Sequence, residues 1–90
     1  MNTTVKLTNT QAQQLNDVVT QTRITRGKNS GQRKDATISI EHFDMRSFNR
    51  LISCKLVAVS EYRHDEWYAT ESGYNVWLQA KQINRNGKTV

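Results

Sequence analysis

The feature that most limits what this chain can fold into is the segment of residues 44–56, which reads DMRSFNRLISCKL. It opens with Asp44, a residue type that often caps a helix N-terminus because its side chain accepts a backbone N–H. Apolar residues then recur at the i, i+3, i+4 spacing of one helix face: Met45, Phe48, Leu51, Ile52 and Leu56. The segment therefore predicts an amphipathic helix over about residues 45–55, with one face on a core and a polar face outside.

Two strand-like runs follow this helix. LVAVSEY (residues 56–62) and EWYAT (66–70) are rich in β-branched and aromatic residues and flank RHD, which predicts a hairpin. Thr70 is a helix-capping residue type in front of residues 71–83, whose apolar side chains repeat at helical spacing. That predicted apolar face comprises Gly73, Tyr74, Trp77, Leu78 and Ala80. The polar residues 84–90 predict a frayed tail.

The N-terminal part of the chain predicts one further helix. Thr8 and Gln11 have the spacing of a capping box, and Leu7 and Ala12 stand at the positions of a hydrophobic staple. Apolar residues recur after them at helical spacing, so we expect a helix over residues 9–22.

The segment between these helices predicts a loop and one short element. Residues 25–35 contain two glycines and no large apolar side chain, and their charged residues are basic except for Asp35, which predicts an exposed basic loop. ATISI (36–40) fits a short strand, whereas SIEHF (39–43) fits a one-turn helix. The pattern does not separate these two.

Size and charge narrow the class of protein. Ninety residues without an internal repeat or a linker predict a single domain over 1–90. The net charge is +5, and the stretch from Arg23 to Lys55 carries all of it, with eight basic residues against three acidic ones. A basic segment beside a folded core is typical of proteins that bind nucleic acid, although a merely solvated basic surface has the same composition.

The sequence also argues against several classes. No apolar run approaches the roughly 20 residues that span a bilayer. With Cys54 as its only cysteine and no signal-peptide pattern, the chain is expected to be a reduced, cytoplasmic protein. His64, Asp65 and Glu66 are consecutive at a hairpin tip, where neighbouring side chains point to opposite faces and cannot converge on a substrate. Two histidines and one cysteine match no zinc spacing, so we expect no enzyme activity, metal or cofactor.

The segments FNRLISCKLVAV (48–59) and YRHDEWYATESGYNVW (62–77) together resemble the winged helix-turn-helix domain of small prokaryotic and phage transcription regulators. Leu51, Leu56 and Val57 match the end of the recognition helix in that family. Tyr68, Thr70 and Gly73 match the step from the wing into the next helix. The resemblance implies an α+β fold of three to four helices with a two- or three-stranded β-wing.

The chain departs from the family pattern at three places. Lys55 stands where the family has a left-handed glycine, which would cost about 1 kcal/mol. The second helix of the motif looks very short, spanning residues 40–43 at most. The wing tip places Glu61, Asp65 and Glu66 beside its basic residues, and phosphates would repel those carboxylates.

The resemblance implies a site on double-stranded DNA. Recognition helices present polar side chains to the major groove, where Arg suits guanine edges and Asn suits adenine. The candidate residues are Arg46, Ser47, Asn49 and Arg50 on that helix, Arg63 in the wing, and Lys28, Arg33 and Lys34 in the basic loop. A homodimer is expected because paired half-sites raise affinity, and the first and last helices are the expected pairing surfaces.

A second function fits the same fold. The domain could be a protein-interaction module, such as a phage- or plasmid-type adaptor or inhibitor of a host protein, without sequence-specific DNA binding. The acidic wing and the basic loop would then contact the partner protein. Duplex binding and its salt dependence distinguish the two functions.

Overall fold

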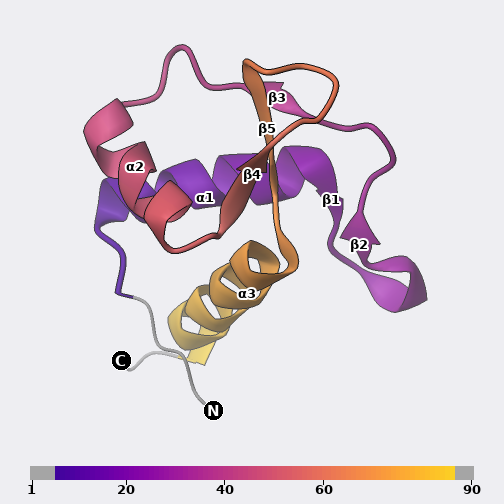
Figure 1. The fold of residues 1–90 in the computed structure, drawn as a ribbon. Helices are drawn as coiled ribbons and strands as arrows, with labels where there is room; N and C mark the ends of the chain where they lie inside the picture. Colours follow the sequence, from indigo (N-terminus) through magenta and orange to yellow (C-terminus); the bar gives the residue numbers. More distant parts are fainter. Residues whose placement is uncertain (1–5, 87–90) are drawn as a thin grey trace.

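The computed structural model describes the backbone of residues 6–86 and the side chains of residues 6–80. This part of the chain is an α+β domain of three α-helices and two small antiparallel sheets (Figure 1). The elements in chain order are α1 (Asn9–Thr22), β1 (Arg23–Ile24), a 3₁₀ turn (Gly27–Asn29), β2 (Gly31–Gln32), β3 (Ile38–Ser39), α2 (Met45–Ser53), β4 (Val57–Val59), β5 (Glu66–Ala69) and α3 (Glu71–Asn86).

Helix α1 has the bounds that the sequence predicts. Its capping box is present: the Thr8 hydroxyl accepts the Gln11 backbone N–H, and the Gln11 side chain accepts the Thr8 N–H. Leu15, Val18 and Val19 are fully buried on its inner face. The helix therefore forms one side of the core against which the other elements pack.

The larger sheet has the order β3-β5-β4, with β5 in the centre. Trp67 of β5 pairs with Ile38 on one side and with Val59 on the other. Strands β4 and β5 form the predicted hairpin, and its loop, residues 60–65, projects beyond β3 in Figure 1. We call the unit of β4, this loop and β5 the hairpin wing.

The smaller sheet corrects the expectation of an irregular loop at residues 25–35. Arg23 pairs with Gln32 and Ile24 with Gly31, so the ends of this loop are tied into a two-strand arm, β1–β2. The tip between them is exposed, as predicted. A two-residue strand is too short to leave an alternating pattern, which is why the sequence does not reveal it.

Of the two alternatives for residues 36–43, the structure has the short strand and not the one-turn helix. Ile38 and Ser39 form β3, and a single turn follows in which the Phe43 N–H donates to the Ile40 carbonyl at 2.9 Å. Asp44 then caps α2 by accepting the Arg46 N–H at 3.1 Å. Between β3 and α2 the chain thus makes one turn and no regular helix.

Helix α2 ends in a left-handed residue, and Lys55 takes this conformation although it is not a glycine. Lys55 has φ 61°, and its N–H donates to the Ile52 carbonyl while the Leu56 N–H donates to the Leu51 carbonyl, both at 2.9 Å. These two bonds make a Schellman motif, which satisfies the last carbonyls of the helix. Leu51 and Leu56 are both buried, so the motif also closes a hydrophobic contact characteristic of this cap.

The core lies between α1, α2, the inner face of the larger sheet and α3. Its buried apolar residues are Leu15, Val18, Val19, Phe48, Leu51, Leu56, Val57, Ala69 and Trp77. Phe48 contacts Trp67 edge-on, with ring centroids 5.4 Å apart. Two members of the predicted apolar faces lie outside: Met45 and Ala80 are exposed, because each stands at an end of the stripe beyond the packed elements.

The last helix is longer than predicted. Thr70 caps it as expected, with its hydroxyl accepting the Gly73 N–H at 3.1 Å. The helix continues to Asn86, three residues past the expected end at Ile83. Of the predicted frayed tail at 84–90, the first three residues are thus helical and the last four lie outside the described residues.

Candidate nucleic-acid interface

Three of the four predicted residues on α2 form one exposed ridge. Arg46, Asn49 and Arg50 are all exposed, and their i, i+3, i+4 spacing places them side by side on the helix surface. Ser47 is half-buried, and its hydroxyl donates to the Asp44 carboxylate at 3.3 Å. Ser47 therefore belongs to the N-terminal cap, and the exposed ridge consists of two guanidinium groups and one amide.

The ridge is held rigidly because the opposite face of α2 is locked into the core. Phe48 and Leu51 have no exposed surface. The start of the helix is also fixed, since the Gln14 side-chain amide on α1 donates to the Asp44 carbonyl at 3.1 Å. The outward direction of Arg46 and Arg50 is thus set by the packing of the helix.

The predicted residues of the basic loop lie on a different part of the molecule. Lys28, Arg33 and Lys34 are exposed, and they follow β1, which continues directly from the C-terminal end of α1. Helix α2 packs near the N-terminal end of α1, and Figure 1 shows α2 and the β1–β2 arm at opposite ends of that helix. With 14 residues, α1 is about 21 Å long. The structure thus separates the predicted basic residues into two groups.

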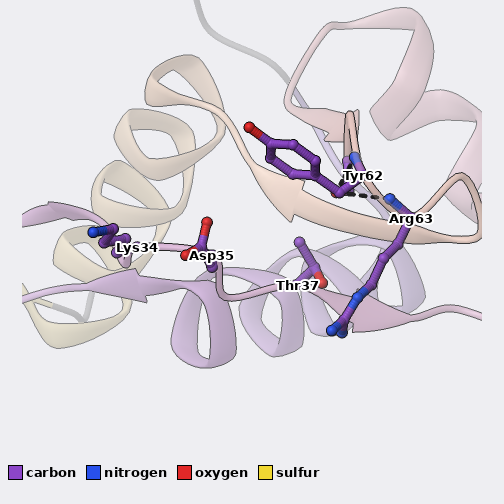
Figure 2. Close-up of a pocket in the computed structure, with 6 residues that line it drawn as sticks. Lys34, Asp35, Thr37, Tyr62 and Arg63 are labelled. Atoms are coloured by element: carbon purple, nitrogen blue, oxygen red, sulfur yellow. Dashed lines mark hydrogen bonds between the residues drawn. The ribbon is translucent and has the colours of Figure 1, made fainter.

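The second group includes the wing residue Arg63. Lys34 and Arg63 both line a cleft of about 570 Å³ between the basic loop and the hairpin wing (Figure 2). Asp35, Thr37, Ser60 and Tyr62 complete its lining. We call this the wing cleft. Arg63 has 65% of its side chain exposed and pairs with Glu66 at 3.4 Å, so its charge is partly balanced.

Glu66 joins the wing to β3. Its carboxylate accepts a hydrogen bond from the Thr37 hydroxyl and faces the Arg63 guanidinium. The pKa of Glu66 is lowered chiefly by the hydrogen bond from Thr37; burial opposes this shift, and the charge and hydrogen bond of Arg63 lower the pKa further. His64 and Asp65 are exposed on the loop beside it.

Arg23 does not belong to the basic surface. The count of basic residues from Arg23 to Lys55 could not reveal this. Arg23 is 5% exposed, donates to the Ala69 carbonyl at 2.8 Å and pairs with Glu71 at 2.9 Å. Its guanidinium also lies 5.2 Å from the ring centroid of Tyr74. Arg23 is a structural residue that joins the end of α1 to the start of α3.

Tyr62 was not among the residues singled out from the sequence, yet it is the most exposed large hydrophobic residue in the described part of the chain, at 84%. It stands past the end of β4, where the period-two pattern of the strand stops. The only sequence signal is an aromatic residue inside a charged turn, between Glu61 and Arg63.

Comparison of the chain with family models, with curated proteins and with solved structures found no match. None of the helices within residues 6–86 is long and apolar enough to cross a membrane. In the same residues, no three or more His, Cys, Asp and Glu side chains gather into a group that could hold a metal ion. The argument for a nucleic-acid interface therefore depends only on the exposure and chemistry of the residues described above.

Proposed function

We propose that this protein is a small DNA-binding transcriptional regulator of the winged helix-turn-helix kind, and that α2 reads the major groove of double-stranded DNA. The observation that carries the proposal is the rigid ridge of Arg46, Asn49 and Arg50. Arg pairs with guanine edges and Asn with adenine edges. The three side chains run along one side of α2 from Arg46 in its first turn to Arg50 in its last, and a helix with such an exposed polar side suits insertion into a major groove.

The order of elements around α2 supports the fold part of the proposal. A single helix precedes β3, and α2 leads through a tight left-handed cap into the wing, whose strand β5 pairs with both β3 and β4. The turn at residues 40–43 replaces the second helix of the motif. The positive net charge of +5 adds a sequence-independent attraction to phosphates.

A gel shift with mixed-sequence duplex DNA at low and moderate salt tests the proposal. We expect binding at low salt that weakens steeply as salt is added, because phosphate contacts release counterions. The double variant Arg46→Ala with Arg50→Ala should abolish the shift. The control variant, Lys28→Ala with Arg33→Ala, removes two positive charges at the opposite end of α1. It should retain most of the duplex binding. Absence of duplex binding at low salt would contradict the proposal.

A homodimer is part of the same proposal, because two copies of α2 on paired half-sites bind more tightly than one. The first and last helices, α1 and α3, are the proposed pairing surfaces. Sedimentation at the protein concentration of the gel shift gives the oligomeric state. A monomer bound to a single half-site would contradict the proposed dimer but not the proposed DNA binding.

The wing loop favours a second candidate, a protein-interaction module of phage or plasmid type that acts on a host protein. Glu61 and Asp65 are exposed in the loop that carries Tyr62, and carboxylates at a wing tip disfavour contact with the phosphates of a DNA duplex. Purified chain immobilised through its N-terminus should then retain one host protein in stoichiometric amount. Tyr62→Ala should release that partner and leave duplex binding unchanged.

A further inference from the structure

The wing cleft has the size and lining of a ligand site. Its volume of about 570 Å³ lies within the usual range of roughly 300–1,000 Å³ for small-molecule pockets. A second hollow of about 230 Å³ adjoins it and shares Asp35, Thr37, Ser60 and Tyr62. Tyr62 and Asp35 thus stand where the two hollows meet.

The backbone beneath Tyr62 is fixed even though its ring is exposed. The Ser60 hydroxyl is buried and accepts the N–H groups of Tyr62 at 3.1 Å and of Arg63 at 3.2 Å. Backbone bonds between Ser60 and Glu66 and between Glu66 and Arg63, at 2.8 and 3.0 Å, close the base of the loop. A large aromatic side chain on a rigid turn can bind a flat partner without first being ordered.

The charged side chains are distributed along the cleft. Figure 2 shows Lys34 toward one end and Arg63 toward the other, with Asp35 and Thr37 between them and Tyr62 above. Two cations at separate ends suit two anionic groups with a neutral group between them. Asp35 can only accept hydrogen bonds, so the neutral group must offer donors and a flat face for Tyr62.

We propose that the wing cleft binds one unpaired nucleotide of a single-stranded nucleic acid. The base stacks on Tyr62, and its two flanking phosphates lie toward Lys34 and Arg63. Stacking on aromatic side chains together with basic groups along the backbone is how single strands are commonly held. Asp35 favours guanine, whose Watson–Crick edge presents two adjacent N–H donors to the two carboxylate oxygens.

This site is separate from the ridge on α2. The proposal for either site can therefore be contradicted while the proposal for the other site holds. The wing cleft lies between the basic loop and the hairpin wing, and none of its lining residues belongs to α2. Arg46→Ala with Arg50→Ala should therefore leave binding of a single strand in the cleft unchanged, whatever it does to duplex binding.

The test is an NMR titration of the ¹⁵N-labelled full chain with the trinucleotide d(TGT), with d(TTT), with dGMP and with inorganic phosphate. We expect d(TGT) to shift the amides of residues 34–37 and 60–63 in a saturable way. It should bind more tightly than d(TTT), because only d(TGT) offers a guanine to Asp35. It should also bind more tightly than dGMP, because dGMP lacks the second phosphate. Equal effects of phosphate and d(TGT), or shifts confined to α2, would overturn the proposal.

Variants of exposed side chains keep the test independent of folding. Tyr62→Ala should weaken d(TGT) binding at least about fivefold, the low end of the loss for one base–aromatic stack, and Tyr62→Phe should restore it. Asp35→Asn tolerates the left-handed backbone at φ 61° and should remove the preference for d(TGT) over d(TTT). His64→Ala, in the same loop but outside the cleft lining, is the matched control. Unchanged binding by Tyr62→Ala would exclude the stacking role.

Discussion

Gly73 of α3 lies directly against the backbone carbonyl of Leu56, so closely that a Cβ at residue 73 would stand 2.0 Å from that oxygen. The same carbonyl accepts the Thr70 N–H at 3.0 Å. The Thr70 hydroxyl donates to the Lys55 carbonyl at 2.7 Å and accepts the Gly73 N–H at 3.1 Å. The Thr-x-x-Gly step thus docks the start of α3 on the end of α2 through the Thr70 hydroxyl and through backbone contacts.

The first prediction follows from this close approach. Gly73→Ala should destabilise the domain by about 2–3 kcal/mol, the upper part of the range for forced overpacking, because its methyl group meets backbone that cannot rotate away. Ser72→Ala, at an exposed neighbouring position, should change stability by less than about 0.5 kcal/mol. Urea unfolding followed by Trp fluorescence measures both, and equal midpoints for the two variants would refute the contact.

The left-handed cap of α2 gives a prediction of opposite sign. Lys55 has φ 61°, a conformation that glycine adopts without steric cost, so Lys55→Gly should stabilise the domain by about 0.5–1 kcal/mol. Ser53→Gly, two residues earlier inside the helix, should destabilise it by a similar amount. The two unfolding midpoints should therefore move in opposite directions. A loss of stability in Lys55→Gly would contradict the cap.

Arg23 gives a third prediction. Arg23→Leu leaves the Ala69 carbonyl without its donor and loses the contact with Tyr74, so it should cost about 1–3 kcal/mol. The cost stays below that of breaking a buried ion pair because the Glu71 side chain is 76% exposed and remains solvated. Arg26→Leu, at an exposed position, is the control and should be nearly neutral. Matching midpoints for the two variants would contradict the structural role of Arg23.

Glu66 makes stability depend on pH in a defined direction. Because the Thr37 hydrogen bond and the Arg63 charge lower its pKa in the folded state, its contribution is present above the unfolded pKa, near 4.5. It is lost as pH falls through the lower folded pKa. Thr37→Val removes the leading cause, so the Glu66 carboxyl should titrate at higher pH by NMR. The stability that the domain loses on acidification should also be smaller in this variant. An unchanged titration in Thr37→Val would contradict this assignment.

The sequence predicts those parts of the fold whose cause is local. The capping box at Thr8 follows from two residues three positions apart and was predicted correctly, whereas Lys55 is left-handed at a position where the resembling family has glycine. Burial of Arg23 follows from contacts with Ala69 and Glu71, far along the chain, and no local pattern contains that information. Exposure of Met45 has a similar cause, because periodicity identifies a helix face but not where the core beneath it ends.

The candidate site was predictable to a similar extent. The polar face of α2 followed from periodicity, and the exposure of Arg46, Asn49 and Arg50 confirms it. The count of basic residues could not show that α1 separates this ridge from Lys34 and Arg63. The wing cleft forms only when the basic loop and the wing, some 25 residues apart in the sequence, lie together.

The last prediction concerns Asn49, the neutral member of the ridge on α2, and rests on the proposed DNA-binding function. Asn49 carries no charge, so Asn49→Ala should leave the salt dependence of duplex binding unchanged while relaxing sequence preference. Loss of one good base contact should weaken the preferred duplex by about 1–3 kcal/mol relative to random duplex. Selection from random duplexes, followed by titration of the best sequence at several salt concentrations, measures both quantities. Asn29→Ala, exposed in the 3₁₀ turn of the β1–β2 arm, should alter neither, and an unchanged sequence preference in Asn49→Ala would exclude Asn49 from base readout.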